Sequence, residues 1–433
     1  MIMKRRSSVI VIILIVCVVA ALVTYVFYSV KSEKEAPRSA SFSIASEREG
    51  ETEEEGKTFA VWIASVYNLN YPTQINMSAD ELRTEAAGIC AKCNELGLNT
   101  VYLQVRPSAD ALYRSDIFPW SSVLTGVQGN DPGCDPLQVF IDEAEKTDIS
   151  VHAWINPYRV TVGSLKYPNT DINKLSENNP ARLHPEWVVE YGGALYFNPG
   201  IPEVRSLIID GALEIARKYA VSGVHMDDYF YPYPVVSDGK TLEFNDSAQF
   251  AEFGGDMTLE DWRRSCVNEL VKGLYTSLKI VNQKLEFGIS PFGVWANNDG
   301  SNGGSDTDAS SEAYYDLFAD AKAWIDGGYI DYICPQIYWS IENEKTPFKM
   351  IYDWWSDILS GTNVKLLPGI AAYKMYDAGA PGWDKTTQVS EQLRYVREHA
   401  NASGAAFYGY EELSAESEAV SMCVAEIESW KNE

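Results

Sequence analysis

Asp227 and Asp228 are adjacent carboxylates at the end of a short apolar segment, in the sequence GVHMDDYFYP at residues 223–232. Side chains alternate across a strand, so His225 and Asp227 share the face opposite the apolar residues. Two neighbouring carboxylates repel each other, which raises one pKa and keeps one group protonated as a general acid. A helix-capping turn is the competing interpretation, but aromatic residues follow here rather than a helical pattern.

Polar and aromatic side chains also occur at the ends of other expected strands. A sugar site needs hydrogen-bonding groups around the ring edges and flat aromatic faces beneath the C–H surfaces. Each residue alone would more often be an ordinary buried polar group, but together they predict such a site. The candidate substrate-binding residues are Arg106, His152, Asn156, Tyr158, Arg159, His225, Tyr229, Gln336, Tyr338 and Trp339.

The body of the chain alternates short β-rich segments with longer helical patterns, which is typical of a parallel sheet wrapped by helices. Strands are expected near residues 60–66, 99–105, 150–155, 223–228, 286–290, 332–338, 365–370 and 405–410. Helices are expected near 79–96, 135–146, 202–219, 259–282, 312–326, 347–359, 387–400 and 415–431. The pattern predicts an α/β fold, a (β/α)8 TIM barrel with long βα loops, whose active site lies at the carboxyl ends of the strands.

The N-terminal segment predicts a membrane anchor. Lys4, Arg5 and Arg6 precede a nearly unbroken apolar run at 9–30, which has the length of a transmembrane helix. The basic residues predict a cytoplasmic N-terminus, and the lack of a clear small-residue cleavage site favours a retained anchor over a cleaved signal peptide. We therefore expect a single-pass protein of the cell membrane with an extracellular catalytic domain.

Three regions follow from this interpretation. Residues 1–30 form the basic tip and the anchor, and residues 31–57 form an acidic, disordered tether with few large apolar side chains. Residues 58–433 form the catalytic barrel.

Composition limits the possible partners and cofactors. The net charge of −26 argues against nucleic acid, because phosphate binding needs clustered Lys and Arg. The seven cysteines show no disulfide framework, and Cys90 and Cys93 have no second pair of ligands. The four histidines are scattered, so we expect neither a metal site nor another cofactor.

Several motifs together resemble glycosyl-hydrolase-like family 10. They are GVHMDDYFYP with VWI at 61–63, QVRP at 104–107, HAWINPYR at 152–159, FNPG at 197–200, GISPFGVW at 288–295 and PQIYW at 335–339. The resemblance covers roughly residues 59–410, and the combination is specific although no single motif is. It implies a (β/α)8 barrel of the kind found in bacterial envelope proteins that act on glycans. One departure is Asp148, which stands before Ile149 where the family pattern suggests glycine.

A more distant resemblance, to α-amylase-type barrels, implies roles for the carboxylates. In those barrels a basic residue lies two positions before the strand-four nucleophile, and here His225 and Asp227 occupy that pattern. Asp227 is therefore the first choice as nucleophile or oxocarbenium stabiliser. Those barrels also place a glutamate at the end of strand five, where this chain has Ser290. The acid must then come from Asp228, Glu411 or a loop residue.

The sequence thus predicts an extracytoplasmic glycoside hydrolase that acts on a polysaccharide, with the peptidoglycan glycan as the expected polymer. The missing strand-five carboxylate supports an alternative from another class, a glycan-binding barrel without hydrolysis. A soluble metal-dependent deacetylase is the third possibility.

Overall fold

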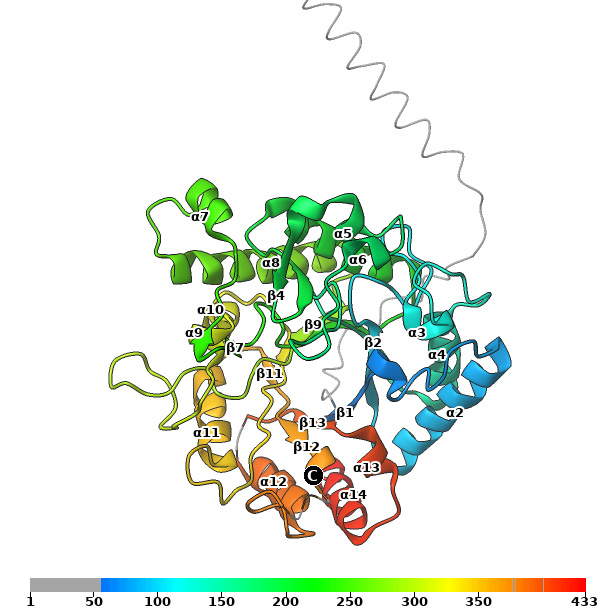
Figure 1. Cartoon of the computed structure of the whole chain (residues 1–433). Coiled ribbons are helices and arrows are strands. Elements are labelled where there is room, and N and C mark those ends of the chain that lie inside the picture. Colours follow the sequence, from blue (N-terminus) through cyan, green and yellow to red (C-terminus); the bar gives the residue numbers. More distant parts are fainter. Residues whose placement is uncertain (1–55, 376, 378, 400) are drawn as a thin grey trace, which may run out of the picture. The chain divides into compact units, whose positions relative to one another are not determined.

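Parallel strands lie at the centre of the protein and helices surround them (Figure 1). The computed structural model describes residues 56–375, 377, 379–399 and 401–433. The main sheet has the order β11-β10-β9-β6-β3-β2-β1-β13-β12. Its strands are β1 (Thr58–Ile63), β2 (Thr100–Arg106), β3 (Ser150–Ile155), β6 (Gly223–Met226), β9 (Glu286–Ile289), β10 (Tyr332–Ile333), β11 (Lys365–Leu366), β12 (Gly369–Ala371) and β13 (Gly404–Tyr408).

The seventh strand of the barrel is split, and the sheet closes through it. β11 and β12 stand at opposite ends of the sheet order, yet they are separated only by Leu367 and Pro368. The Leu367 N–H donates to the Ile333 carbonyl at 2.9 Å, and the Ala406 N–H donates to the Pro368 carbonyl at 3.0 Å. These bonds join β10 to β13 through one interrupted strand. Proline lacks the N–H that a regular ladder needs, which accounts for the interruption.

All eight expected strands are present, but the sixth is shorter than predicted. It was expected near residues 332–338, whereas β10 ends at Ile333. Pro335 interrupts the ladder for the same reason as Pro368. Beyond it, the Gln336 N–H still donates to the Pro291 carbonyl at 3.0 Å, so the chain continues towards the barrel mouth beside its neighbour.

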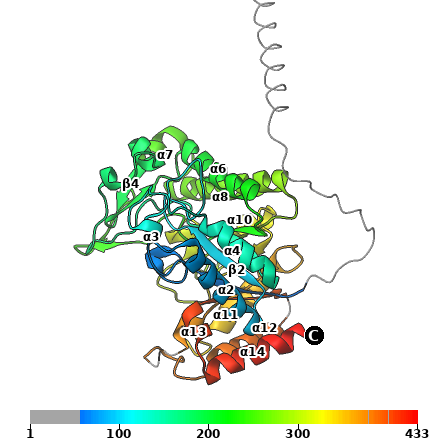
Figure 2. The same ribbon diagram turned by 90° about the vertical axis from the view of Figure 1, so that its right-hand side faces the viewer.

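Helices follow the strands and cover the outside of the barrel. The main helices are α2 (Ala79–Glu95), α4 (Pro136–Ala144), α6 (Pro202–Lys218), α8 (Leu259–Val281), α10 (Ala321–Asp326), α11 (Phe348–Leu359), α12 (Gln388–Glu398) and α14 (Glu418–Lys431). Short helices are α3 (Ser122–Thr125), α5 (Pro180–Leu183), α7 (Ser247–Phe253), α9 (Ala313–Asp316) and α13 (Tyr410–Ser414). In Figures 1 and 2, α2 and α4 lie side by side outside β1 and β2.

Two local features differ from the expected pattern. The helix expected near 312–326 is divided into α9 and α10, and Phe318 between them has a positive φ of 53°. The long loops carry two small hairpins, β4 (Val188–Tyr191) with β5 (Ala194–Phe197), and β7 (Val236–Ser237) with β8 (Lys240–Thr241). Asp148 has φ of 54°, a conformation that glycine adopts more easily, so the backbone at this position would also suit the glycine that the family resemblance suggested.

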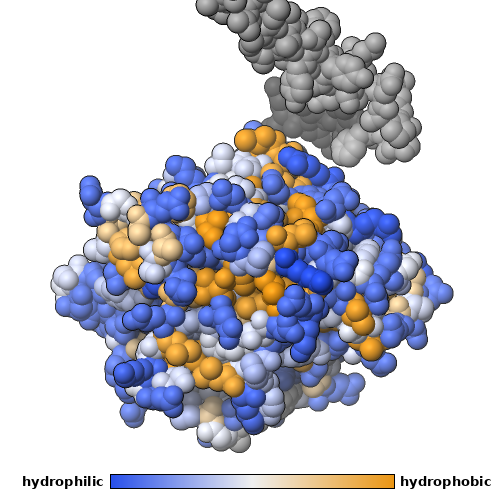
Figure 3. Space-filling view, turned by 45° about the horizontal axis from the view of Figure 1, so that its top comes forward, coloured by the Kyte–Doolittle hydropathy of each residue, from blue (hydrophilic) through white to orange (hydrophobic). Residues whose placement is uncertain are grey.

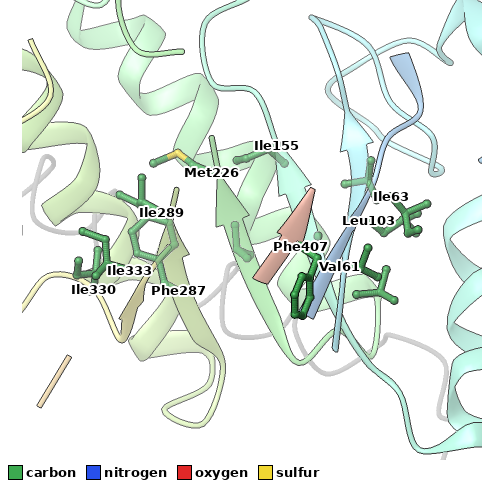
Figure 4. Close-up of a cluster of buried hydrophobic side chains, with 14 of the residues drawn as sticks. Val61, Ile63, Leu103, Ile155, Met226, Phe287, Ile289, Ile330, Ile333 and Phe407 are labelled. Carbon is green, nitrogen blue, oxygen red and sulfur yellow. The ribbon is translucent and has the colours of Figure 1, made fainter. Parts of the chain in front are cut away.

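Alternation along the strands separates two buried layers. Apolar side chains such as Val61, Leu103 and Met226 pack between the strands and the helices, as Figure 4 shows. Inside the barrel, a second cluster contains Trp62, Tyr102, Trp154 and Tyr332. The face in Figure 3 is mostly hydrophilic, with hydrophobic residues in separate patches. The strands thus send rings inward, beneath the mouth, and aliphatic groups outward.

The predicted anchor at 9–30 and most of the predicted tether lie outside the described residues. Within the described part of the chain, no helix combines the length and the apolar character needed to cross a membrane.

Candidate active site

A pocket of about 250 Å³ lies at the carboxyl ends of the strands and contains both aspartates. It is lined by Trp62, Trp154, Asp227, Asp228, Tyr229, Tyr233, Ser290, Gln336, Tyr338 and Tyr408. Three larger hollows, of about 620, 510 and 500 Å³, contain neither Asp227 nor Asp228. The smaller pocket is therefore the candidate active site, because the paired carboxyl groups lie there.

Asp227 is held in one orientation by its neighbours. β6 ends at Met226, so Asp227 and Asp228 both lie beyond the regular strand and both line the pocket. Asp227 Oδ2 accepts hydrogen bonds from Trp154 Nε1 at 2.9 Å and from Asn156 Nδ2 at 3.3 Å. From the described residues, Oδ1 receives only a long hydrogen bond, from the Tyr229 backbone N–H at 3.4 Å. The Oδ1 atom is thus the one that remains to hold a proton.

Asp228 is held by different groups. The Tyr233 hydroxyl donates to Asp228 Oδ2, and the Gln336 side chain also hydrogen-bonds this carboxyl group. Gln336 is fixed in turn, because its Nε2 donates to the Ser290 carbonyl at 2.9 Å. These neutral donors stabilise the ionised form of Asp228.

Burial raises the pKa of both carboxyl groups. The exposed fraction is 4% for Asp227 and 3% for Asp228. Burial, followed by the charge of Asp228, raises the pKa of Asp227 to about 7, while Arg159 and the Trp154 hydrogen bond oppose this rise. Burial also raises the pKa of Asp228, but the hydrogen bonds from Tyr233 and Gln336 oppose it. Because the charge of Asp228 is one of the causes that raise the pKa of Asp227, Asp228 is the ionised member of the pair while Asp227 keeps its proton up to nearly neutral pH.

Arg159 supplies a positive charge beside the pair. Its guanidinium donates from Nε and from a terminal nitrogen to the Pro107 carbonyl, at 2.9 and 2.7 Å. The same group lies 5.4 Å from the centre of the Tyr229 ring. Arg159 lowers the pKa of both aspartates, so it favours a negative charge in the pocket.

Aromatic rings form much of the pocket wall. Tyr338 and Tyr408 are stacked, with ring centres 6.1 Å apart and planes at 17°. Trp62 meets Tyr408 edge-on at 6.2 Å. Trp62, Trp154, Tyr233 and Tyr408 were not among the candidate residues. Alternation placed Trp154 on the same face as Asn156, so the signal for that residue was present in the sequence.

The structure places His225 and His152 beneath the pocket and outside its lining. His225 Nε2 accepts from Trp62 Nε1 at 3.0 Å, and its Nδ1 lies 3.1 Å from the Tyr332 hydroxyl. His152 Nδ1 contacts the same hydroxyl at 2.8 Å. Burial lowers the pKa of His225 and lowers that of His152 to about 3. Both rings are therefore neutral supports of the pocket floor, which differs from the substrate-binding role predicted for them.

Arg106 and Tyr158 also lie away from the pocket. The pairing of β2 with β3 shifts register between Gln104 and Arg106, and this bulge turns Arg106 outward. Its guanidinium packs on the Phe118 ring at 4.2 Å. Tyr158 is completely buried in the outer core. These positions do not fit the predicted contact with substrate.

The remaining candidates surround the pair at different distances. Tyr229, Gln336 and Tyr338 line the pocket, and Asn156 lies beneath Asp227. Trp339 is half-buried outside the lining, with its ring against Phe292 at 5.5 Å.

Glu411 is not brought to the aspartates. It is exposed at the start of α13 and does not line the pocket. Among the described residues, no group of three His, Cys, Asp or Glu side chains is arranged to hold a metal ion. In the described structure, the carboxyl groups that line the pocket are those of Asp227 and Asp228.

Together the fold and the pocket define a (β/α)8-barrel protein with a carboxylate pair and aromatic walls at the carboxyl ends of its strands. The model of the family Glycosyl hydrolase-like 10 matches residues 57–383. The chain belongs to this family, as its motifs predicted.

Named relatives agree with this assignment. The chain is 43% identical over 357 residues to "Glycosyl hydrolase YngK" of Bacillus subtilis (strain 168), covering 82% of this chain and 68% of the relative. It is 36% identical over 336 residues to "Glycosyl hydrolase DigH" of Escherichia coli (strain K12), covering 75% of each chain.

Solved structures show a more distant similarity. The α-L-fucosidase isoenzyme 2 from Paenibacillus thiaminolyticus has a TM-score of 0.48 at 12% identity, and the match covers 86% of this chain and 49% of that one. The GH36 α-galactosidase AgaA from Geobacillus stearothermophilus has a TM-score of 0.47 at 11% identity, covering 87% and 42%. This chain therefore spans half or less of those larger proteins.

Proposed function

We propose that this protein is a glycoside hydrolase in which Asp227 is the general acid and Asp228 is the ionised carboxylate. The observation that carries the proposal is the buried pair in one aromatic pocket, in which burial and the charge of Asp228 raise the pKa of Asp227 to about 7. Glycoside hydrolysis needs one carboxyl group that gives a proton and another that stays ionised. The family and the names of the relatives support the same reaction class.

The two carboxyl groups take different roles in this proposal. Asp227 donates a proton from Oδ1 to the oxygen of the leaving sugar, because its Oδ2 already accepts two N–H groups. Ionised Asp228 stabilises the positive charge that develops at the anomeric carbon. These roles are the reverse of the sequence-based prediction, in which Asp227 was the nucleophile or oxocarbenium stabiliser.

The test of hydrolysis compares variants of the pair with a matched carboxylate outside the pocket. Asp227→Asn and Asp228→Asn should each lower kcat by about a hundredfold or more, because general acid catalysis alone contributes that much. Glu411→Gln should leave kcat within about twofold, since the exposed side chain lies outside the pocket. Full activity in both aspartate variants would refute the proposed pair.

The proposed substrate is the glycan of peptidoglycan. The support is the predicted anchor at 9–30, which would leave the barrel outside the cell, where this polymer is the abundant glycan. The barrel should be assayed against purified sacculi, peptide-stripped glycan strands and storage or plant polysaccharides. Cleavage restricted to the last group would refute the cell-wall substrate.

The proposed location is the outer side of the cell membrane, with residues 31–57 as the tether. The basic residues before the apolar run support this orientation. Protease treatment of intact cells, with the outer membrane opened if there is one, should digest the barrel and leave a cytoplasmic control protein whole. A barrel that is protected until the cytoplasmic membrane is lysed would refute the proposed orientation.

A second candidate function is glycan binding without hydrolysis. The observation that favours it is the neutral character of the neighbouring strand ends, where Ser290 and Gln336 stand instead of carboxylates. In that case the wild-type protein and the Asp227→Asn variant should bind glycan strands equally well, and neither should release reducing ends.

A further inference from the structure

The two carboxyl groups of the pocket belong to consecutive residues. Both follow the last residue of β6, so both belong to the same strand end. The other strand ends contribute Trp62, Ser290, Gln336 and Tyr408 to the pocket. Among the described residues, no acidic side chain other than these two aspartates lines it.

Catalytic residues of a barrel usually come from the ends of several different strands, whereas both carboxyl groups here come from one strand end. A retaining enzyme with its own nucleophile flanks the scissile bond with two carboxyl groups about 5–5.5 Å apart, and an inverting enzyme leaves about 6.5–9.5 Å for a water molecule. Both geometries need carboxyl groups on opposite sides of the sugar. Two consecutive residues of one strand end share one wall of the pocket. A pair placed in this way is suited to serve the leaving oxygen and a substituent on the same ring.

We infer that the substrate carries a 2-acetamido group at the bond that is cleaved, and that the carbonyl oxygen of this group is the nucleophile. This inference rests on the proposed function and specifies its substrate class as N-acetylhexosamine glycosides. Asp228 accepts a hydrogen bond from the acetamido N–H and holds the group beneath the anomeric carbon. Asp227 is the proton donor to the leaving oxygen.

The reaction then balances in two steps. The acetamido oxygen forms a bond to the anomeric carbon while the glycosidic C–O bond breaks, and the Asp227 proton goes to the leaving oxygen. The product is a cyclic oxazolinium ion, whose N–H is stabilised by ionised Asp228. Water then attacks the anomeric carbon and gives its proton back to Asp227, and the ring reopens to the acetamido group. The net change is the addition of one water molecule, with retention of the anomeric configuration.

The remaining pocket walls fit this substituent. Tyr338 and Tyr408 lie side by side in the lining, and within the described chain their hydroxyl groups make no hydrogen bond, so they can donate to the acetamido carbonyl. The Trp62 N–H is already used by His225. The Trp62 ring therefore offers the pocket an apolar surface suited to a methyl group.

The first experiment changes the acyl group and leaves the rest of the polymer intact. Peptide-stripped glycan strands are chemically N-deacetylated, and portions are re-acylated with acetyl, difluoroacetyl or trifluoroacetyl groups. Re-acetylated strands should be cleaved within about twofold of native strands. Fluorination withdraws electrons from the carbonyl oxygen, so kcat/KM should fall progressively, by about a hundredfold or more for trifluoroacetyl strands. Equal rates for all acyl groups would overturn the inference.

The second experiment looks for a protein nucleophile. The wild-type protein is incubated with 2-deoxy-2-fluoro glycosides and with an N-acetylglucosamine thiazoline, which mimics the oxazolinium ring. The thiazoline should inhibit competitively, and mass spectrometry should find no sugar attached to the protein. A glycosyl adduct on Asp227 or Asp228 would overturn the inference while leaving glycoside hydrolysis established. Failure of the wild-type protein to cleave any glycan would instead refute the proposed function.

Discussion

The Asp227 carboxyl group has a raised pKa because the protein buries it beside a second carboxylate. The same burial has consequences for catalysis and for stability. Above the pKa of Asp227, the acid for the leaving group is lost and two negative charges are buried together. Both effects are measurable at the level of this one residue.

The pH dependence of the rate should show the loss of this acid. We expect kcat/KM to fall as the pH rises through about 7, the pKa of Asp227. With an aryl leaving group that needs no proton, the decrease should be much weaker. A profile that stays flat up to pH 9 on a natural glycan would contradict the assignment of Asp227 as the acid.

Stability should depend on pH in the opposite sense to that of a salt-bridged aspartate. The folded pKa of Asp227 is above its unfolded value, so the folded state binds more protons and the free energy of unfolding falls as the pH rises from about 4 to 7. Asp227→Asn removes the buried charge, so at pH 8 it should be more stable than wild type by on the order of 2 kcal/mol. This difference should shrink towards pH 4, as measured by urea unfolding at each pH.

At the level of secondary-structure elements, a chain of buried hydrogen bonds joins four strands beneath the pocket. Because Trp62 donates to Nε2 of His225, the His225 proton must lie on Nδ1, where it is donated to Tyr332. The Tyr332 hydroxyl can then donate to Nδ1 of His152, whose Nε2 lies 3.5 Å from a Glu286 oxygen. The chain fixes one tautomer of each histidine and connects β1, β6, β10 and β3.

Tyr332→Phe should break this chain in its middle. Two buried histidine nitrogens would lose their partner, at a cost of about 3 kcal/mol in the free energy of unfolding. The ¹⁵N shifts of His225 should also show a departure from a single Nδ1–H tautomer. Tyr231→Phe is the matched control, because the buried Tyr231 hydroxyl has no partner in the described structure. Equal stability of the two variants would contradict the proposed chain.

At the level of the whole molecule, the loops after β1, β2 and β3 form one of the larger hollows. It has a volume of about 500 Å³ and includes Tyr67 and Pro107 in its lining. Pro107 accepts the hydrogen bonds of Arg159 beside the aspartates. Tyr67 is 78% exposed, with a positive φ of 58°, so the loop holds an aromatic ring towards solvent in a conformation that costs energy.

We expect this hollow to bind further sugars of a long chain. Tyr67→Ala should lower kcat/KM on long glycan strands about fivefold, because about 1 kcal/mol of contact between the ring and a sugar is lost. The kcat/KM on the shortest fragment that is still cleaved should not change. Ile280→Ala, which removes an 80% exposed side chain of α8, is the control. A loss that is equal for all chain lengths would argue for a general structural effect of Tyr67.

Local sequence patterns were enough to predict the strand count and the position of Asp227 and Asp228 at the end of a strand. These features depend on local patterns, since alternation and turn residues act within a few positions of the chain. The sequence also placed Tyr229, Gln336 and Tyr338 at the mouth, where the structure has them. The family motifs added the reaction class, which no local pattern contains.

Which polar residues reach the pocket depends on contacts between distant parts of the chain. A bulge turned Arg106 outward. Strand alternation predicted that His152 and His225 would face the mouth, but side chains from neighbouring strands bury both of them beneath the pocket. Tyr408 joined Tyr338 because the split seventh strand closes the barrel between their strands. The raised pKa of Asp227 has the same origin: burial depends on what the rest of the fold places around a residue, and residues distant in sequence supply most of those surroundings.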